Sequence, residues 1–365
     1  MSSQGFNSSG WGYYFEITSD NTKVDNANDN ILYDFANAPA AFWDNVESET
    51  GDDIRITNSA GDTAYSFELE NFSKSGETGI VFFDSSILAT GSNTTWRIYY
   101  GNSGASMPAP SDTLGAENVW NSDYKAVFHL EDTNDSTSND NNGTNNGATS
   151  GATGQIGDAY DFDGNGYIED IGASLSQETQ ATLSLWIKSD WDRDTGRNSY
   201  QSLIVQQDSW NNLFGLTQDN EGELTFSQRK GGSDADRQII QKDVTSYRDD
   251  WLYISAVYDS GNYKLYFDGD LVEEETGSFD SIATLSNPLN IANNAYADRI
   301  FCQSIIDDLR ISNSSLSANW ISTEYNNQSS PSTFWTTGSE QSPNTPPDAP
   351  TNPTPADNAT GVILS

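Results

Sequence analysis

The sequence predicts an all-β chain made of two antiparallel β-sandwich domains in tandem. Alternation of apolar and polar residues with a period of two recurs along the chain, helical periodicity is almost absent, and turn-forming residues separate the alternating segments. A length of 365 residues suits about two domains. The aromatic fraction of 12% indicates a folded chain, because disordered acidic segments are poor in aromatic residues.

Five segments carry the alternation most clearly, and their apolar side chains are expected to face a core. They are residues 13–17, 65–69, 183–187, 252–258 and 263–267. Turn signals at 60–62, 260–262 and 268–269 contain Gly, Asn or Asp, which tolerate a positive φ. Two short helices are expected, from Pro39 to Val46 and from Ser317 to Tyr325.

A change in composition divides the chain. Residues 101–119 are rich in Gly, Pro and Ser and are interpreted as a joint between a first domain, 1–115, and a second domain, 116–341. The two domains are expected to fold independently. Residues 342–365 are interpreted as a Pro-rich linker and the beginning of a further module of the same longer chain, and we expect this segment to be mobile. The polar run 132–154 predicts a long surface loop.

The net charge of −38 excludes a nucleic-acid binder, since a phosphate polymer would be repelled, and it disfavours anionic membrane surfaces. His129 and Cys302 are the single histidine and the single cysteine, which excludes zinc fingers, iron–sulfur sites and disulfide scaffolds. The acidic, Asn-, Ser-, Thr- and Gly-rich composition suits an extracytoplasmic protein, whether secreted, at the cell surface or periplasmic. Solubility in salty water is a compatible alternative explanation.

The second domain resembles the laminin-G-like, concanavalin A-like jelly-roll family of lectin modules over nearly its whole length. The resemblance rests on short motifs that occur in the family's order: residues 127–130, 135–136, 142–143, 157–164, 167–168, 183–187, 251–259, 264–269, 288–291, 306–311 and 316–317. It implies a jelly-roll sandwich and carbohydrate recognition. It also implies two acidic sites, an Asp-rich loop after the first strand and an Asp pair before the last.

The first domain resembles a family of unknown function, DUF2341. The resemblance rests on residues 11–14, 52–57, 61–62, 67–70 and 96–102. It implies a β-sandwich in surface-exposed or secreted multi-module proteins, some of them fused to proton-channel-type membrane components. It implies no reaction, because fold analogy supports architecture and not activity.

The sequence shows no combination of residues that forms a recognisable catalytic site, and we therefore expect the protein not to be an enzyme. Glycosidases on jelly rolls need two carboxylates that face each other across a cleft. Glu68 and Glu70 are the nearest approach to such a pair, but they lie on the polar side of a predicted strand and are interpreted as solvated. A catalytic triad would have to use His129, which lies in a strand pattern and is interpreted as a packed core residue.

Structural calcium is the expected cofactor, because Ca²⁺ takes six to eight oxygen ligands, many of them carboxylates. First and last strands are commonly neighbours in jelly rolls, so the two acidic sites that the resemblance implies are expected to converge on one ion. The alternative is that each Asp caps a turn or is solvated. The candidate ligands are Asp132, Asp135, Asp140, Asp307 and Asp308.

Sugar recognition needs an aromatic platform beside planar polar side chains, because a pyranose has an apolar face and a rim of hydroxyls. Aromatic residues in predicted loops, flanked by Asn, Asp or Gln, satisfy this pattern. The alternative is a rim Trp folded back onto the sandwich. The candidates are Trp191, Tyr200, Asp208, Trp210 and Asn211.

The resulting hypothesis is a non-catalytic pair of modules that binds a glycan or a cell-surface polysaccharide, or serves adhesion, and is stabilised by calcium. One alternative is a structural spacer in a long surface protein. Another is the exterior sensor part of a membrane-anchored assembly. A binding module should cluster loop aromatics at one end, whereas a spacer should scatter them.

Overall fold

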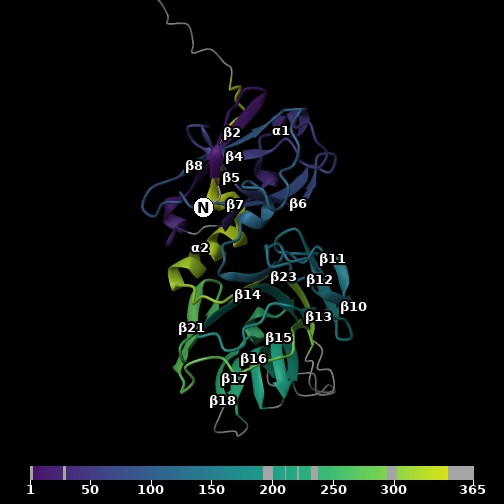
Figure 1. Ribbon diagram of the computed structural model, residues 1–365, viewed down its shortest axis with the longest axis vertical. Coiled ribbons are helices and arrows are strands. Elements are labelled where there is room, and N and C mark those ends of the chain that lie inside the picture. The colour runs from purple at the N-terminus through teal and green to yellow at the C-terminus, as the bar shows by residue number, and fades with distance from the viewer. Residues whose placement is uncertain are drawn as a thin grey trace, which may run out of the picture.

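A computed structural model describes residues 3–27, 30–191, 200–209, 211–219, 222–231, 237–293 and 302–343. The two domains are stacked along the long axis, the first above the second in Figure 1, with helix α2 beside the level at which they meet. Strands predominate and every named strand pairing is antiparallel, which confirms the all-β prediction. The helices among these residues are short. They are α1 (Ala41–Asn45), α2 (Ala318–Ser329), α3 (Pro331–Phe334) and the 3-10 turns η1 (Asn21–Lys23), η2 (Phe35–Asn37), η3 (Ala116–Asn118) and η5 (Thr245–Tyr247).

The first domain packs a six-stranded sheet against a three-stranded sheet. The larger sheet has the order β1-β5-β4-β8-β2-β24, and the smaller one has the order β3-β7-β6. Aromatic side chains such as Phe15, Tyr33 and Phe42 fill the core between them. The strands are β1 (Ser3–Gly5), β2 (Tyr13–Ser19), β3 (Asn30–Asp34), β4 (Arg55–Asn58), β5 (Thr63–Tyr65), β6 (Phe67–Ser73), β7 (Thr78–Asp84), β8 (Thr95–Tyr100) and β24 (Trp335–Thr337).

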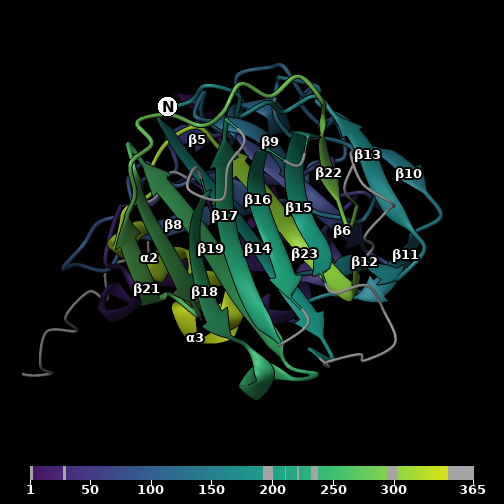
Figure 2. The same ribbon diagram turned by 90° about the horizontal axis from the view of Figure 1, so that it is seen from below.

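The second domain packs two larger sheets face to face. Their orders are β10-β13-β22-β15-β16-β17-β18 and β11-β12-β23-β14-β19-β20-β21, with β9 paired to β23. Seen from below, the seven-stranded sheet forms the end of the molecule remote from the first domain (Figure 2). The strands are β9 (Tyr124–Phe128), β10 (Thr144–Asn146), β11 (Thr149–Thr153), β12 (Asp158–Asp163), β13 (Tyr167–Ile171), β14 (Gln180–Ser189), β15 (Tyr200–Ser209), β16 (Asn212–Asp219), β17 (Glu223–Lys230), β18 (Arg237–Asp243), β19 (Trp251–Asp259), β20 (Asn262–Phe267), β21 (Asp270–Thr276), β22 (Leu289–Ile291) and β23 (Gln303–Ser312).

Four of the five alternating segments form the expected strands, and the fifth, 65–69, is divided between β5 and β6, which belong to different sheets. Leu183, Leu185 and Ile187 of β14 lie in the core of the second domain, together with Ile254 and Leu265 from the neighbouring strands. The expected helices also form, as α1 and α2. The prediction of one long loop over 132–154 is wrong in its second half, because β10 and β11 pair with β13 and β12 there. Their side chains are mostly exposed, so alternation gave no signal.

The chain returns to the first domain after completing the second. Helix α2 follows β23, and α3 leads into β24, which pairs with β2. Phe334 and Trp335 lie in the core of the first domain, and the backbones of Tyr14 and Gln341 form a bridge. The predicted boundary at 341 is therefore wrong for the last residues of the second range, which complete the first sandwich.

The two domains share an apolar cluster, which we call the interdomain core. Leu32 and Phe82 contribute to it from the first domain, Trp186 and Tyr253 from the second, and Ile321 from α2. All five side chains are almost fully buried. The expectation of two independently folding modules disagrees with this arrangement, because separating the domains would expose the cluster to water. Within the described residues, no helix has the length and apolarity that a membrane span requires.

Candidate functional site

The outer face of the seven-stranded sheet carries polar side chains. On β16 and β17, Phe214 and Phe226 point into the core, so the residues that alternate with them point outward. Thr217 and Thr225 are opposite each other on this outer face, and Gln241 lies opposite Thr225 on the next strand. The seven-stranded sheet therefore presents polar side chains away from the sandwich. The strands β16, β17 and β18 that carry them lie at the front in Figure 2.

These groups form a hydrogen-bonded cluster, which we call the outer polar cluster. The Gln241 amide donates to the Thr225 hydroxyl at 3.2 Å and to the Asp219 carboxylate at 3.2 Å. Gln241 is exposed, Thr217 and Asp219 are half-buried, and Thr225 is buried. The exposed Gln241 amide and the half-buried Asp219 carboxylate and Thr217 hydroxyl are suited to the hydroxyl rim of a sugar, while the buried Thr225 hydroxyl holds the amide in place.

The residues predicted to bind sugar do not form one site. Trp191 is fully buried in the core of the second domain, so its role as an exposed platform is wrong. Asp208 is a loop-capping residue, because its carboxylate accepts hydrogen bonds from the backbone of Ser286 and Asn287 and from the Ser286 hydroxyl. Asn211 is exposed, and its backbone N–H donates to Ser209 Oγ. Trp210 and the side chain of Tyr200 lie outside the described residues.

A second candidate site lies where the domains meet. We call it the interdomain pocket, a cavity of about 660 Å³ with many acidic side chains on its walls. Glu68 and Glu70 come from β6, Glu117 from η3, and His129 and Glu131 from the segment that follows β9. The loop 132–142 forms the remaining wall and includes Asp132, Asp135 and Asp140.

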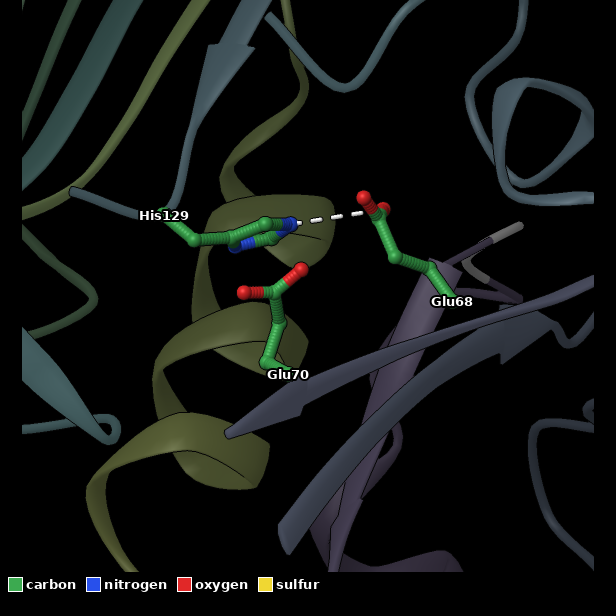
Figure 3. A group of neighbouring side chains, drawn as sticks. All are labelled: Glu68, Glu70 and His129. Carbon is green, nitrogen blue, oxygen red and sulfur yellow. Dashed lines mark hydrogen bonds and ion pairs between the residues drawn. The ribbon is translucent and has the colours of Figure 1, made fainter. Parts of the chain in front are cut away.

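Glu68, Glu70 and His129 converge inside this pocket. One potential ligand atom from each lies within 4.8 Å of the others. The two glutamates project from β6 toward the imidazole, which comes from the other domain (Figure 3). His129 Nε2 is 3.4 Å from Glu68 Oε2, and Trp120 Nε1 donates to the same oxygen at 2.7 Å. The interpretation of Glu68 and Glu70 as solvated is therefore wrong, because the second domain covers the strand face that carries them.

The concentration of carboxylates perturbs the protonation of this group. Burial raises the pKa of Glu70 well above its ordinary value, and the carboxyl groups of Glu68 and Glu131 raise it further, against the opposing effect of His129. Burial alone would lower the pKa of His129. The carboxylates of Glu70, Glu68 and Asp308 outweigh burial and raise that pKa well above its ordinary range. A cationic imidazole therefore partly balances the buried carboxylates.

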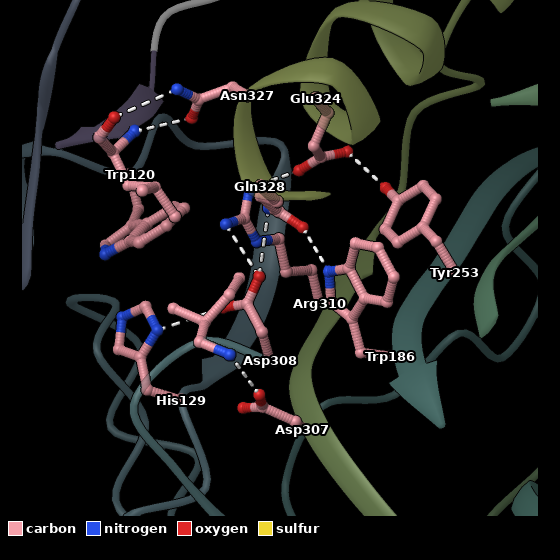
Figure 4. A network of polar contacts seen from close by, with 12 residues as sticks. Trp120, His129, Trp186, Tyr253, Asp307, Asp308, Arg310, Glu324, Asn327 and Gln328 are labelled. Atoms are coloured by element: carbon pink, nitrogen blue, oxygen red, sulfur yellow. Dashed lines mark hydrogen bonds and ion pairs between the residues drawn. The ribbon is translucent and has the colours of Figure 1, made fainter. Parts of the chain in front are cut away.

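His129 is also the end of a buried polar network that reaches helix α2 (Figure 4). Its Nδ1 is 3.0 Å from Asp308 Oδ1, and Arg310 forms an ion pair with Asp308 at 2.8 Å and another with Glu324 of α2. Gln328, also on α2, donates to Asp308 at 3.1 Å. Burial opposes ionisation of Asp308, but Arg310 and His129 hold its pKa below the ordinary value. His129 is buried, as the sequence predicted, but its neighbours include the carboxylates of Asp308 and Glu68 and not only apolar side chains.

The five predicted calcium ligands do not converge on one point. Among the described residues, the group of Glu68, Glu70 and His129 is the one with three or more acidic or metal-ligating residues at mutual ligand distance. Asp308 already pairs with Arg310 and His129. Asp307 is fully buried and accepts a hydrogen bond from the Ile156 backbone at 2.8 Å. The expected convergence of the loop with Asp307 and Asp308 is therefore wrong.

The loop aspartates act as turn caps instead. Asp135 accepts hydrogen bonds from the backbone N–H groups of Val127, Thr137 and Asn141, which use both of its carboxylate oxygens. Asp132 accepts from the backbone of Asn134, at 2.8 Å. Asp140 accepts from the side chain of Asn142, at 2.6 Å. These bonds fold the loop into one wall of the interdomain pocket.

Comparison with protein families gives two matches in succession. Residues 50–146 match the domain of unknown function DUF2341, and residues 162–322 match the family described as the concanavalin A-like lectin/glucanases superfamily. The first match extends beyond the first sandwich into β9 and β10, and it includes Glu68, Glu70 and His129. No curated protein sequence matches the chain.

Solved structures with partial similarity share low sequence identity. Domain 4 of AbnA, a GH43 extracellular arabinanase from Geobacillus stearothermophilus in complex with arabinotriose, is 19% identical with a TM-score of 0.40 over 55% of this chain and 96% of its own. The binding domain of botulinum neurotoxin serotype D is 17% identical with a TM-score of 0.45, over 59% of this chain and 53% of its own. The chain thus spans about half the length of the neurotoxin domain. The chain is thus similar to DUF2341 over residues 50–146 and to the concanavalin A-like lectin/glucanases superfamily over residues 162–322.

Proposed function

We propose that the chain is a non-catalytic, glycan-binding module pair that works outside the cytoplasm, either in recognition or in adhesion. The observation that carries this proposal is the outer polar cluster of Asp219, Thr225 and Gln241 on a concanavalin A-like sandwich. A carboxylate and an amide held in place by mutual hydrogen bonds lose little side-chain entropy on binding a ring of hydroxyls. The net charge of −38 favours neutral or cationic glycans over polyanionic ones.

The test is a glycan array probed with the full chain, followed by titration of any retained glycan. Gln241→Ala should weaken binding by at least about tenfold, since it removes a hydrogen-bonding group worth about 1.5 kcal/mol at a sugar interface. Gln238→Ala is the matched control: Gln238 is on the same strand, and its amide donates to Glu275 on another strand. Equal loss in both variants, or none in either, would reject the cluster as the site. Shortening of the retained glycan would reject the non-catalytic assignment.

A structural spacer is the second candidate. The interdomain core supports it, because a buried apolar cluster joined by α2 makes the two domains one rigid unit. The described residues also show no exposed aromatic platform: their exposed large hydrophobic side chains are Ile87, Met107 and Leu271. A spacer would retain no glycan on the array, and Gln241→Ala would then change nothing.

A further inference from the structure

We propose that Glu68, Glu70 and His129 form a binding site for a divalent transition-metal cation, of which Zn²⁺ is the type, between the two domains. The three side chains offer one nitrogen and two carboxylate ligands, all within 4.8 Å of one another. They lie on the wall of the interdomain pocket, so an ion and a water ligand can reach them. This proposal goes beyond glycan binding and is independent of it.

The orientation of the imidazole is the first step of the argument. The His129 ring stacks on Phe82 with a centroid separation of 4.3 Å, and its Nδ1 contacts Asp308 at 3.0 Å. Asp308 is in turn fixed by Arg310 and Gln328. Histidines that ligate metals usually donate their second ring N–H to a carboxylate, which fixes the tautomer and the ring direction. Asp308 therefore occupies the position of the orienting carboxylate, and Nε2 is left to face the two glutamates (Figure 3).

The spacing of the ligand atoms is the second step. His129 Nε2 and Glu68 Oε2 are 3.4 Å apart, which is long for a direct hydrogen bond. Bond lengths of about 2.0 to 2.2 Å to nitrogen and oxygen place neighbouring ligand atoms of a tetrahedral zinc site about 3.3 to 3.6 Å apart. The observed separation of 3.4 Å agrees with this distance between neighbouring ligand atoms. One carboxylate oxygen of Glu70, on the pocket wall, lies within 4.8 Å of both of these atoms.

The ligand types select the class of metal. Ca²⁺ and Mg²⁺ take oxygen ligands, whereas imidazole nitrogen suits zinc and other late first-row cations. A set of one histidine and two carboxylates leaves the fourth position for water or for an incoming ligand. Glu131 lines the same pocket and offers a carboxylate to that water. The site therefore differs in residues and in chemistry from the calcium site expected from the sequence.

The location gives the ion a structural consequence. Glu68 and Glu70 belong to the first domain and His129 to the second, so one ion would join the domains beside the interdomain core. Zn²⁺ would displace the Nε2 proton of His129 and place two positive charges between the carboxylates of Glu68 and Glu70. Binding should therefore stabilise the folded chain by mass action.

The experiment titrates Zn²⁺ into the full, chelator-treated chain by isothermal calorimetry and follows Co²⁺ substitution by visible absorption. We expect one stoichiometric site that millimolar Ca²⁺ does not displace, and an intense Co²⁺ spectrum of four-coordinate type. Glu70→Gln keeps the shape of a side chain on an open pocket wall and should raise the Kd at least about tenfold. Asp308→Asn, a change in a positioning residue, should raise it about 10- to 100-fold.

Glu117→Gln is the matched control, because Glu117 lines the same pocket outside the ligand group and loses the same charge. It should bind Zn²⁺ as the unaltered chain does. His129→Gln should abolish binding, and if that variant does not fold, Glu70→Gln decides the question. Absence of stoichiometric binding, equal affinity of the Glu70→Gln and unaltered chains, equal losses in Glu70→Gln and Glu117→Gln, or displacement by Ca²⁺ would each overturn the proposal.

Discussion

Trp335 donates its indole N–H to the backbone carbonyl oxygen of Leu32 at 2.7 Å, across more than 300 positions of the sequence. Leu32 belongs to β3 and also exchanges two backbone hydrogen bonds with the Asn327 side chain of α2. One residue of the first domain is thus held by both parts of the segment that follows the second domain. The return of the chain is fixed by specific polar contacts as well as by burial.

Replacing Trp335 should destabilise the whole chain. Trp335→Ala removes a side chain that is 5% exposed from the first core, so we expect a loss of about 3 to 5 kcal/mol in the free energy of unfolding. Denaturant unfolding followed by intrinsic fluorescence measures it. Thr336→Ala, the exposed neighbour on β24, should change stability by less than about 0.5 kcal/mol. Similar small effects of both substitutions would mean that β24 contributes little to the first domain.

Removing Arg310 from the buried ion network should lower the free energy of unfolding. Arg310→Met leaves Asp308 and Glu324 buried without their common cation, and we expect a loss of about 3 to 5 kcal/mol. The control is the surface pair of Lys264 and Glu274, for which Lys264→Ala should cost at most about 1 kcal/mol. Urea titrations of both variants make the comparison. If Arg310→Met lowers the free energy of unfolding no more than the control does, the carboxyl groups of Asp308 and Glu324 must be hydrated or protonated in the variant at no net cost.

Acid should weaken the cap formed by Asp208. Burial is the largest single influence on the pKa of Asp208 and would raise it, but the hydrogen bonds from the Asn287 backbone and from the side chain and backbone of Ser286 together outweigh burial and hold this pKa below its ordinary value. A depressed pKa contributes stability that is present above the unfolded value, near 4, and is lost as the pH falls through the folded value. Asp208→Asn should therefore destabilise the chain at pH 7, and the difference from the unaltered chain should shrink below about pH 4. A difference that is constant with pH would show that the carboxylate charge plays no part.

Calcium dependence stays a prediction for the loop 132–142. If Asp132 and Asp140 complete an oxygen site with backbone groups, Ca²⁺ at about a thousand times its Kd would add roughly 4 kcal/mol to the stability. Melting curves in EDTA, Ca²⁺ and Mg²⁺ measure the effect, and the Asp132→Asn/Asp140→Asn double variant should remove it. Asp163→Asn serves as a control, since Asp163 caps a hairpin elsewhere. Superimposable curves in EDTA and Ca²⁺ would exclude the site.

The strands could be predicted because alternation records which side of a strand is apolar. It does not record what covers the other side, and Glu68 and Glu70 were misjudged for this reason: their strand face is polar, but a second domain lies on it. Trp191 was predicted to be exposed because its neighbours in the sequence are polar, but it lies in the core of the second domain. The pairing of β24 with β2 joins residues far apart in the chain, and three residues of β24 carry no periodic signal. The Asp-rich loop 132–142 was the sequence feature that pointed toward the interdomain pocket, because it forms one of its walls.

The return of the chain through β24 also determines how the protein would carry a mechanical load. Both described ends of the chain, at residues 3 and 343, belong to the first sandwich, and the second domain is inserted between β8 and β24. Tension between those ends would load the pairing of β1 with β5 near residue 3 and then the strand pair β2–β24, starting at the bridge between Tyr14 and Gln341. Because these two residues lie at the same end of an antiparallel pair, the bonds would open one after another, as in a zipper. The second domain would lie outside the line of force and stay intact while β24 is peeled away.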